Sequence, residues 1–498
     1  MPWNLKQLSV STSVVLAILL SYFLLLILVG FVTTRKANSE MFFTANRNSP
    51  WYLVAFGMIG TTLSGVTFIS IPGEVGNTHW TYLAVVAGNC VGYIVIALVL
   101  LPLYYKQNLV SIYSWLGSRF GEKARLTGSF FFIVSQLVGA SFRLFLVVGV
   151  LQLAFFDAVG IPFPVTVFVT IAFVWIYTVR GGIKTIVWTD ALQTICILVS
   201  VGLTIAVVNK ALELDFSSAV AAVKESPLSR VFDFDWRSGQ NTVKQFLAGI
   251  AITVCLNGLD QNMMQKNLTC RSLRDCKTNM FTFSFLFLVT NLLFLMLGAL
   301  LYMYAEREGI VLPGKSDDVF PFLSLNYFGT AAGIFFLLGI TAAAYSSVDS
   351  SLTSLTTSFC IDFLKIDPRN KRDKRKRMGV HVVFSLLMIF VVVLFRELNN
   401  SSVISALFKA VGYTYGPLLG LFAFGLTTRC QVREKYIPLV CLISPVLSYV
   451  VNCYSEELLF GYKFGFEILL LNGLLCYLGL LLIREKRHKS MPVTTLKA

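Results

Sequence analysis

Thirteen blocks of apolar residues, most of them close to 20 residues long, constrain this chain more than any other feature. A helix rises about 1.5 Å per residue, so about 20 residues cross a hydrocarbon core about 30 Å thick. Of the 498 residues, 56% are hydrophobic and 13% are charged, whereas a soluble domain has about 25% charged residues. The sequence therefore predicts an all-α polytopic protein of the lipid bilayer. The predicted spans are 10–33, 50–72, 80–105, 126–156, 162–179, 184–207, 242–266, 278–304, 330–364, 378–396, 400–427, 436–453 and 465–483.

The distribution of positive charge predicts the orientation. Lys and Arg gather in alternate connections and in the tail, with the runs KRDKRKR at 371–377 and REKRHK at 484–489. Because positively charged loops stay on the cytoplasmic side, we expect the N-terminus outside and the C-terminus inside. The net charge of +15 is thus a topology signal, and we expect no nucleic-acid partner.

Cysteine and histidine offer little chemistry in this sequence. The ten cysteines form no C-x-x-C pair and lie mostly in apolar runs, which indicates buried small side chains. The three histidines are far apart in the sequence, which argues against a metal centre and against histidine-based catalysis. We therefore expect a protein that is not an enzyme.

Five charged residues fall inside the predicted spans. An unpaired charge at the centre of a membrane helix costs about 2.5–3.5 kcal/mol or more, so such residues usually face a bundle interior or an aqueous path. The five are Arg143, Asp190, Asp260, Asp349 and Lys409. They are the first candidates for function.

Two spans carry glycines and polar residues that invite a break in the helix. The stretches are GMIGTTLSG at 57–65 and NGLDQN at 257–262. Breaks at matching places in two halves indicate a transporter built from inverted repeats, with its site near the midplane; kinks without a binding role are the alternative. We predict one transporter domain over 1–498. Its parts are an extra helix in 1–40, repeats at 50–207 and 242–427, two further helices in 436–483 and a cytoplasmic tail at 484–498.

The stretch TAAAYSSVDSSLTS at 341–354 places hydroxyls and a carboxylate in an otherwise apolar span. Residues three and four apart are neighbours on a helix, so one stripe forms. Hydroxyls, together with carbonyls freed at a helix break, are hard ligands suited to Na⁺, although small residues also serve close helix packing. The stripe contains Ala343, Ser346, Ser347, Ser350, Ser354 and Thr357.

Several motifs, in order along the chain, resemble the sodium:solute symporter family. They run from MFFTANRNSPWYL at 41–53 to GYTYGPLLGLF at 412–422, and the most specific are YTVRGGIKTIVWTDALQ at 177–193 and AAAYSSVDS at 342–350. The resemblance implies the leucine-transporter fold, with two inverted five-helix repeats after an extra N-terminal helix. In its pocket pattern the chain is most similar to the sialic acid carriers of the family.

The resemblance implies where Na⁺ would bind. The first site would use the backbone carbonyls of Gly60, Leu63 and Ala343 with the hydroxyls of Ser346 and Ser347. In some members a second Na⁺ site matches Asp190, Ser346, Asp349 and Ser350 here. This chain departs from that pattern at Asp349, where a serine is expected. A carboxylate there could strengthen a cation site, hold a proton or pair with a lysine.

Arg143 is the main candidate for binding the transported solute. Its planar guanidinium suits a carboxylate, and the resemblance implies a carboxylate-binding group made of Arg143 with Thr62, Ser64 and Thr67 of TLSGVT. Asn257, in CLNGLDQ, lies where sugar carriers have aromatic gates, which makes a neutral hexose less favoured. Two questions stay open here: internal pairing of Arg143 with Asp260 or Asp349, and the role of Lys409.

Together these features predict a secondary active transporter in the plasma membrane, or in the inner membrane of a Gram-negative source. It would couple Na⁺ to a small organic solute, an anion such as sialic acid or another carboxylate, and work as a monomer. The alternatives are symport of a neutral solute (sugar, inositol or amino acid), and a non-transporting sensor or a channel of the same fold.

Overall fold

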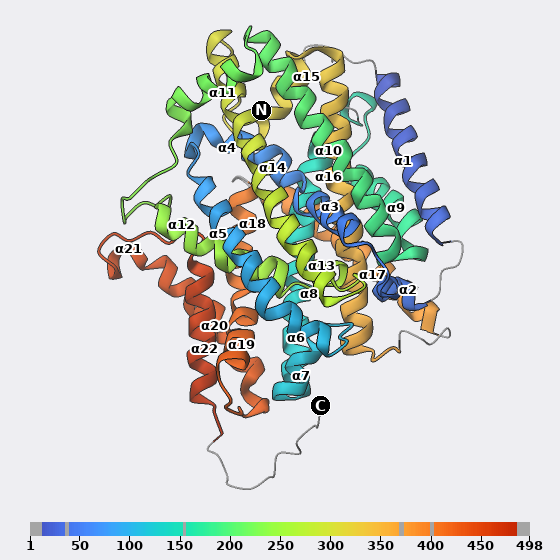
Figure 1. Cartoon of the computed structure of the whole chain (residues 1–498), viewed down its shortest axis with the longest axis vertical. Coiled ribbons are helices and arrows are strands. Elements are labelled where there is room, and N and C mark those ends of the chain that lie inside the picture. The colour runs from blue at the N-terminus through green and yellow to red at the C-terminus, as the bar shows by residue number, and fades with distance from the viewer. Residues whose placement is uncertain (1–11, 35–38, 153–155, 368–372, 399–402, 486–498) are drawn as a thin grey trace.

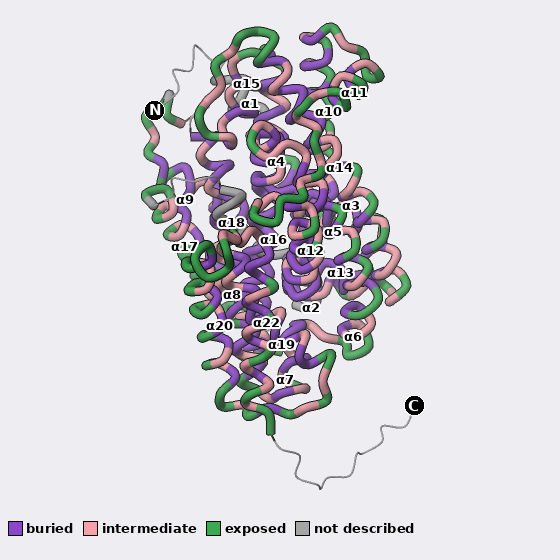
Figure 2. Tube along the Cα trace, turned by 90° about the vertical axis from the view of Figure 1, so that its left-hand side faces the viewer, coloured by how far each residue is buried: buried purple, intermediate pink, exposed green. Residues whose placement is uncertain are grey.

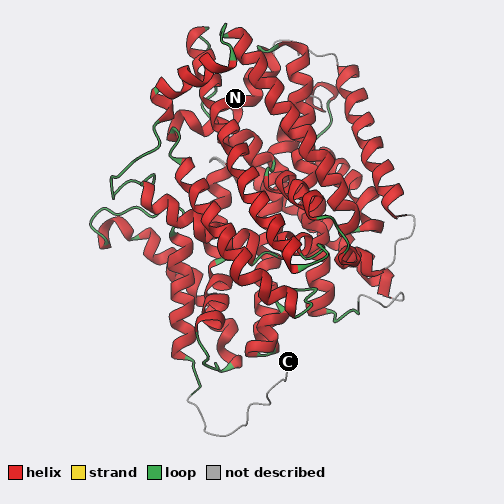
Figure 3. Cartoon of the chain, in the orientation of Figure 1, coloured by secondary structure: helices red, strands yellow, loops and turns green. Residues whose placement is uncertain are grey.

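The computed structural model describes residues 12–34, 39–152, 156–367, 373–398 and 403–485. In this part of the chain helices joined by loops make up the structure, as Figure 3 shows. The pairings between extended residues are two isolated bridges, Ser49 with Cys270 and Val432 with Arg484. The predicted all-α class is therefore confirmed. The predicted tail lies outside the described residues beyond its first two positions, as do the first residues of the predicted spans 10–33 and 400–427.

The helices of the first half are α1 (Thr12–Thr34), α2 (Ser39–Thr44), α3 (Trp51–Thr62), α4 (Gly65–Thr78), α5 (Tyr82–Val95), α6 (Leu101–Lys106), α7 (Ser114–Phe120), α8 (Glu122–Leu151), α9 (Phe163–Gly181), α10 (Ile183–Ala211) and α11 (Phe216–Glu225). Those of the second half are α12 (Thr242–Thr253), α13 (Gln261–Asn267), α14 (Leu273–Arg307), α15 (Val319–Asn326), α16 (Gly329–Ser358), α17 (Lys374–Leu398), α18 (Val403–Thr414), α19 (Gly416–Thr427), α20 (Ile437–Cys453), α21 (Ser455–Leu458) and α22 (Ile468–Leu482). Single π-helical turns continue α5, α12 and α16: η2 (Ile96–Leu100), η6 (Val254–Gly258) and η8 (Phe359–Phe363). Short 3₁₀ turns are η1 (Ala45–Arg47), η4 (Asp157–Val159), η5 (Pro227–Ser229), η7 (Ser316–Asp318) and η10 (Glu434–Tyr436).

Both predicted breaks are present. Among the described residues, 7 helices are long and apolar enough to cross a membrane, and two bent pairs bring the number to 9. The pairs are α3 with α4, bent by 58°, and α12 through η6 with α13, bent by 67°. Four shorter apolar helices, at 20–33, 163–176, 416–427 and 468–482, overlap the remaining predicted spans.

The long helices differ in how much of their surface the protein covers. The apolar window of α16 is 78% buried, the highest share among the long apolar helices of the described residues, while those of α17 and α20 are 28% and 22% buried. Figure 2 shows α16 surrounded by other helices. The polar helix predicted at 341–354 is thus shielded by protein from the hydrocarbon that α17 and α20 are suited to face.

The first described helix begins, and the last one ends, at opposite poles of the molecule. In Figure 1, α1 begins near the top and α22 ends at the bottom.

Helices α5 and α12 approach almost backbone to backbone. A Cβ atom at Gly88 would overlap the carbonyl oxygen of Phe246, and one at Gly249 would overlap the carbonyl oxygen of Val85. In membranes, small residues at helix interfaces permit this close contact and the dispersion energy that comes with it. The two glycines therefore hold the second broken span against its neighbour.

This contact predicts a large cost for a small side chain. We expect Gly249→Ala to lower the melting temperature of the purified protein, because overpacking typically costs about 1–3 kcal/mol. Gly202→Ala is the matched control, since nothing lies within 4 Å of a Cβ built there. Equal melting temperatures for the two variants would contradict the backbone contact.

Candidate functional site

The hydroxyls of α16 differ in their hydrogen-bond partners. Five of them donate to a carbonyl one turn earlier in the same helix, as Ser351 does to Ser347 (2.6 Å) and Thr357 to Thr353 (2.8 Å). Ser346 and Ser347 instead donate across the helix interface, toward α10 and α3. The stripe predicted from spacing thus contains two serines that reach other elements.

The first broken span brings free backbone groups to these serines. Helix α3 ends at Thr62, the chain turns at Leu63 (ψ 62°) and α4 starts at Gly65. Carbonyls in the last turn of a helix lack the partner that a continuing helix would supply. The Ser347 hydroxyl lies 3.4 Å from the carbonyl oxygen of Thr61, so α16 and the end of α3 meet at the predicted place.

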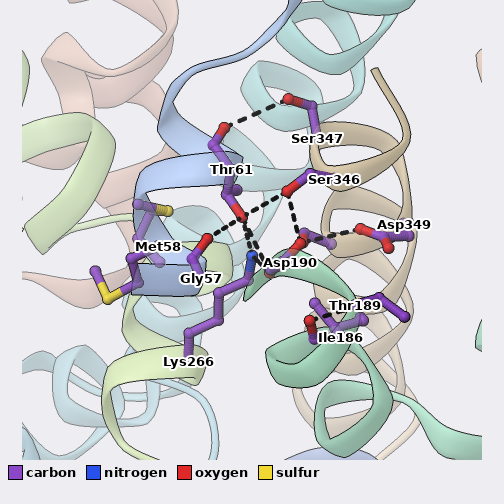
Figure 4. Close-up of polar contacts among 12 residues, drawn as sticks. Gly57, Met58, Thr61, Ile186, Thr189, Asp190, Lys266, Ser346, Ser347 and Asp349 are labelled. Atoms are coloured by element: carbon purple, nitrogen blue, oxygen red, sulfur yellow. Dashed lines mark hydrogen bonds and ion pairs between the residues drawn. The ribbon is translucent and has the colours of Figure 1, made fainter. Parts of the chain in front are cut away.

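A buried ion pair lies beside this junction. Lys266, on α13, has 1% of its side chain exposed, and its Nζ lies 2.5 Å from Oδ2 of Asp190, whose side chain is fully buried on α10. Lys266 also donates to the Thr61 hydroxyl. Figure 4 shows Thr61, Asp190 and Lys266 pointing toward one another. One ammonium therefore joins α13, α3 and α10.

Both oxygens of Asp190 are engaged. Oδ1 accepts the Ser346 hydroxyl at 2.6 Å, while Oδ2 accepts from Lys266 and, at 3.1 Å, from the Thr61 hydroxyl. The Thr61 and Ser346 hydroxyls are 3.2 Å apart. The four side chains form one network that carries a carboxylate and an ammonium, hence no net charge.

Lys266 is absent from the five charges predicted inside the spans, and that prediction is wrong in leaving it out. The residue is the last of the predicted span 242–266, where a lysine is typical of a cytoplasmic membrane boundary. The structure instead buries all seven residues of α13. The signal that could have found it is the position of a lysine six residues after Asp260, on the far side of the second break.

The residues predicted for the first Na⁺ site lie on two facing elements. Gly60 and Leu63 belong to the end of α3, while Ala343, Ser346 and Ser347 are fully buried on α16. A Cβ at Gly60 would overlap the Thr194 hydroxyl, so this glycine allows α3 to lie directly on α10. Carbonyl and hydroxyl oxygens in a protein interior suit a hard monovalent cation, and the donor set fits Na⁺.

The residues predicted for a second Na⁺ site already bind groups of the protein itself. Asp190 is held by Lys266, and Asp349 accepts the hydroxyl of its neighbour Ser350 on Oδ1 at 3.1 Å. The lysine pairing considered for Asp349 occurs at Asp190. The Lys266 ammonium therefore contacts the Asp190 carboxylate, which the predicted second site needs free of a cation.

All five residues predicted to bind the solute line one cavity of about 110 Å³ beside the first break. It extends between α3, α4, α5, α8, η6 and α14, and further amides and hydroxyls join its wall. The predicted residues are Thr62, Ser64, Thr67, Arg143 and Asn257. The cavity also includes Thr61, which links it to the Lys266 network.

Arg143 has no acidic partner among the described residues, where no ion pair joins it to a carboxylate within 4.0 Å. Asp260 lines the same cavity, but its side chain caps α13 by accepting the backbone N–H groups of Asn262 (2.7 Å) and Met263 (3.2 Å). It also accepts the Tyr415 hydroxyl at 2.5 Å. The guanidinium thus remains available to a solute.

Lys409 does not take part in this site. It is exposed on α18 and lines none of the site's cavity. Of the two roles considered for it, neither a contact to the solute in this cavity nor a buried partnership with an aspartate is seen.

Comparisons with known proteins identify relatives of this chain. The sodium/sialic acid symporter NanT of Aliivibrio fischeri is 26% identical over 427 residues, which cover 83% of each chain. The sodium/sialic acid symporter SiaT of Proteus mirabilis is 24% identical and covers 87% of this chain and 88% of its own. A solved Na⁺-coupled sialic acid symporter has the same fold, with a TM-score of 0.79 at 19% identity over 94% of this chain and 97% of its own.

The family match covers most of the sequence. Residues 42–431 match the Sodium:solute symporter family. This range includes both breaks, helix α16, Arg143 and Lys266. The family and these relatives are membrane transporters rather than enzymes. On this match, the chain belongs to the sodium:solute symporter family.

Proposed function

We propose that this chain is a secondary active transporter that couples Na⁺ to the uptake of a small carboxylate. The observation that carries the proposal is Arg143, a permanent cation that lines the cavity and has no carboxylate partner among the described residues. A guanidinium that makes no direct ion pair inside a membrane protein is costly. A solute carboxylate would supply that ion pair and accept two parallel hydrogen bonds.

The cavity wall supports an anion bound at one end. Thr62, Ser64 and Thr67 lie around the first break and line the same cavity as the guanidinium. The related symporters NanT and SiaT are named for sialic acid, which is a carboxylate with many hydroxyls. We therefore propose sialic acid or another small carboxylate as the solute, with Asn257 as a contact to its polar body.

Na⁺ would bind between α3 and α16, at the carbonyls of Gly60, Leu63 and Ala343 and the hydroxyls of Ser346 and Ser347. Such an ion would hold the end of α3 against α16. The solute cavity starts at the same break, so each ligand would stabilise the conformation that the other requires. Coupling of this kind is reciprocal, because each ligand raises the affinity for the other by the same factor.

For the architecture we propose thirteen crossings, with repeats at 50–207 and 242–427. The overlap of the helices with the predicted spans supports the number of crossings. The basic runs near 371–377 and 484–489 support an N-terminus outside and a C-terminus inside. We further propose that the integral membrane transporter works as a monomer in the plasma membrane, or in the inner membrane of a Gram-negative source.

Uptake into proteoliposomes tests the function directly. We expect labelled sialic acid, or lactate as a smaller carboxylate, to accumulate when Na⁺ is high outside, and not when K⁺ replaces Na⁺. Uptake driven equally by a proton gradient without Na⁺ would contradict Na⁺ coupling. Transport of glucose or inositol, with no carboxylate carried, would contradict the anion proposal.

Removal of the two serine hydroxyls tests the first Na⁺ site. We expect Ser346→Ala with Ser347→Ala to raise the Na⁺ concentration for half-maximal uptake by about tenfold or more, since a lost charged hydrogen bond costs about 1.5–3 kcal/mol. Ser354→Ala is the matched control, because its hydroxyl donates to Ser351 within the same helix. An unchanged Na⁺ dependence in the double variant would remove the serines from the site.

Substitution of the guanidinium tests the anion contact. We expect Arg143→Gln to weaken binding of the carried carboxylate by about 10- to 100-fold, and Arg143→Lys to recover only part of it, because lysine cannot form the planar fork. Thermal shift and uptake would report the affinity, and Lys409→Gln would control for the loss of a positive charge. If the affinity of Arg143→Gln matched that of the native protein, the role of Arg143 would be wrong.

A further inference from the structure

Lys266 is a charged residue that the proposed transport cycle does not use. It is the one buried lysine among the described residues. Its partners are oxygen atoms of two other elements, the Asp190 carboxylate and the Thr61 hydroxyl. A lysine so placed needs an explanation, because ionisable residues in membrane spans are costly and usually functional.

The ammonium occupies the place of a bound cation. It carries the single charge of Na⁺, and it contacts the Asp190 oxygen on which the predicted second Na⁺ would depend. The other oxygen of Asp190 accepts Ser346, whose hydroxyl also belongs to the first predicted Na⁺ site. The network thus has the ligands of a cation site with the cation attached to the chain.

The backbone around Lys266 is fixed. Asp260 caps the start of α13, and the Gln265 amide donates to the Phe43 carbonyl (2.8 Å) and to the Thr357 hydroxyl (3.1 Å). Thr269 donates to the Lys266 carbonyl at 2.6 Å. These contacts hold the side chain at Asp190 from both ends of the short helix.

We propose that Lys266 is a tethered cation that fills the Asp190 position, so that this chain binds Na⁺ only at the first site. The proposal rests on the proposed function for the existence of that first site. A second Na⁺ at Asp190 would have to share one carboxylate with an ammonium, and like charges at one carboxylate repel each other. The bound lysine would also join α13 to α10 in every cycle without crossing the membrane itself.

Equilibrium binding of ²²Na⁺ to the purified full-length chain in lipid nanodiscs tests this proposal. We expect one Na⁺ per native chain at saturation, and two in Lys266→Met, where the vacated carboxylate can take an ion. Adding Asp190→Asn to Lys266→Met should return the number to one. Lys409→Met, which removes an exposed lysine, should bind the same number as the native chain.

Two outcomes would overturn the tethered cation. The first is an equal number of bound Na⁺ in Lys266→Met and in the native chain. The second is two bound Na⁺ in the native chain, one of which is lost on Asp190→Asn alone, a variant that does not require Lys266→Met to fold. As a further measurement, the melting temperature of Lys266→Met should rise more steeply with Na⁺ concentration than that of the native chain, since each ligand that binds only the folded state stabilises it.

The same experiment separates this proposal from the proposed function. If the native chain bound no Na⁺ while Lys266→Met bound one that depends on Asp190, the tethered cation would stand and Na⁺ coupling would fall. If the native chain bound two Na⁺, coupling would stand and the tethered cation would fall.

Discussion

The absence of water from the bilayer interior is the constraint on which this structure depends. Each backbone or side-chain polar group inside the spans must find its partner within the protein, or pay several kcal/mol. Five hydroxyls of α16 meet this condition inside their own helix, as Ser351 does with Ser347. Ser346 and Ser347 of α16 find their partners outside the helix instead. They donate to Asp190 on α10 and to the Thr61 carbonyl at the end of α3. The site is thus the place where the polar groups of several interrupted or polar helices satisfy each other.

Much of this arrangement could be predicted from the sequence because it depends on local composition. Glycines and polar residues inside an apolar run predicted the break at Leu63, and helical spacing predicted that Ser346 and Ser347 share a face. An aspartate after an interrupted helix is also a common start signal for the next one, and Asp260 has that role. In each case the interacting groups lie within a few turns of one another.

Lys266 could not be found in this way because its burial depends on distant parts of the chain. Five of the seven residues of α13 have polar side chains, a composition that a hydrophobicity pattern assigns to a loop. Lys266 and Asp190 are 76 positions apart in the sequence. Only the fold brings the short helix α13 against α3 and α10. Thr61 was not predicted as a site residue for a related reason. Its neighbours Gly60 and Thr62 were assigned from family positions, whereas the Thr61 hydroxyl contacts Asp190 and Lys266 only through the fold.

A positive charge fixed in the chain, in place of a second Na⁺, would change what drives the solute inward. Each charge that crosses the membrane gains about 2.3 kcal/mol per 100 mV, and a second travelling Na⁺ would collect that energy in each cycle. With Lys266 at Asp190, a cycle that carries one Na⁺ and one monocarboxylate moves no net charge. Its accumulation ratio then follows the Na⁺ concentration ratio alone, and a tenfold Na⁺ gradient supports about 1.4 kcal/mol of uptake. Such a carrier would work at the same thermodynamic limit in an energised and in a depolarised cell.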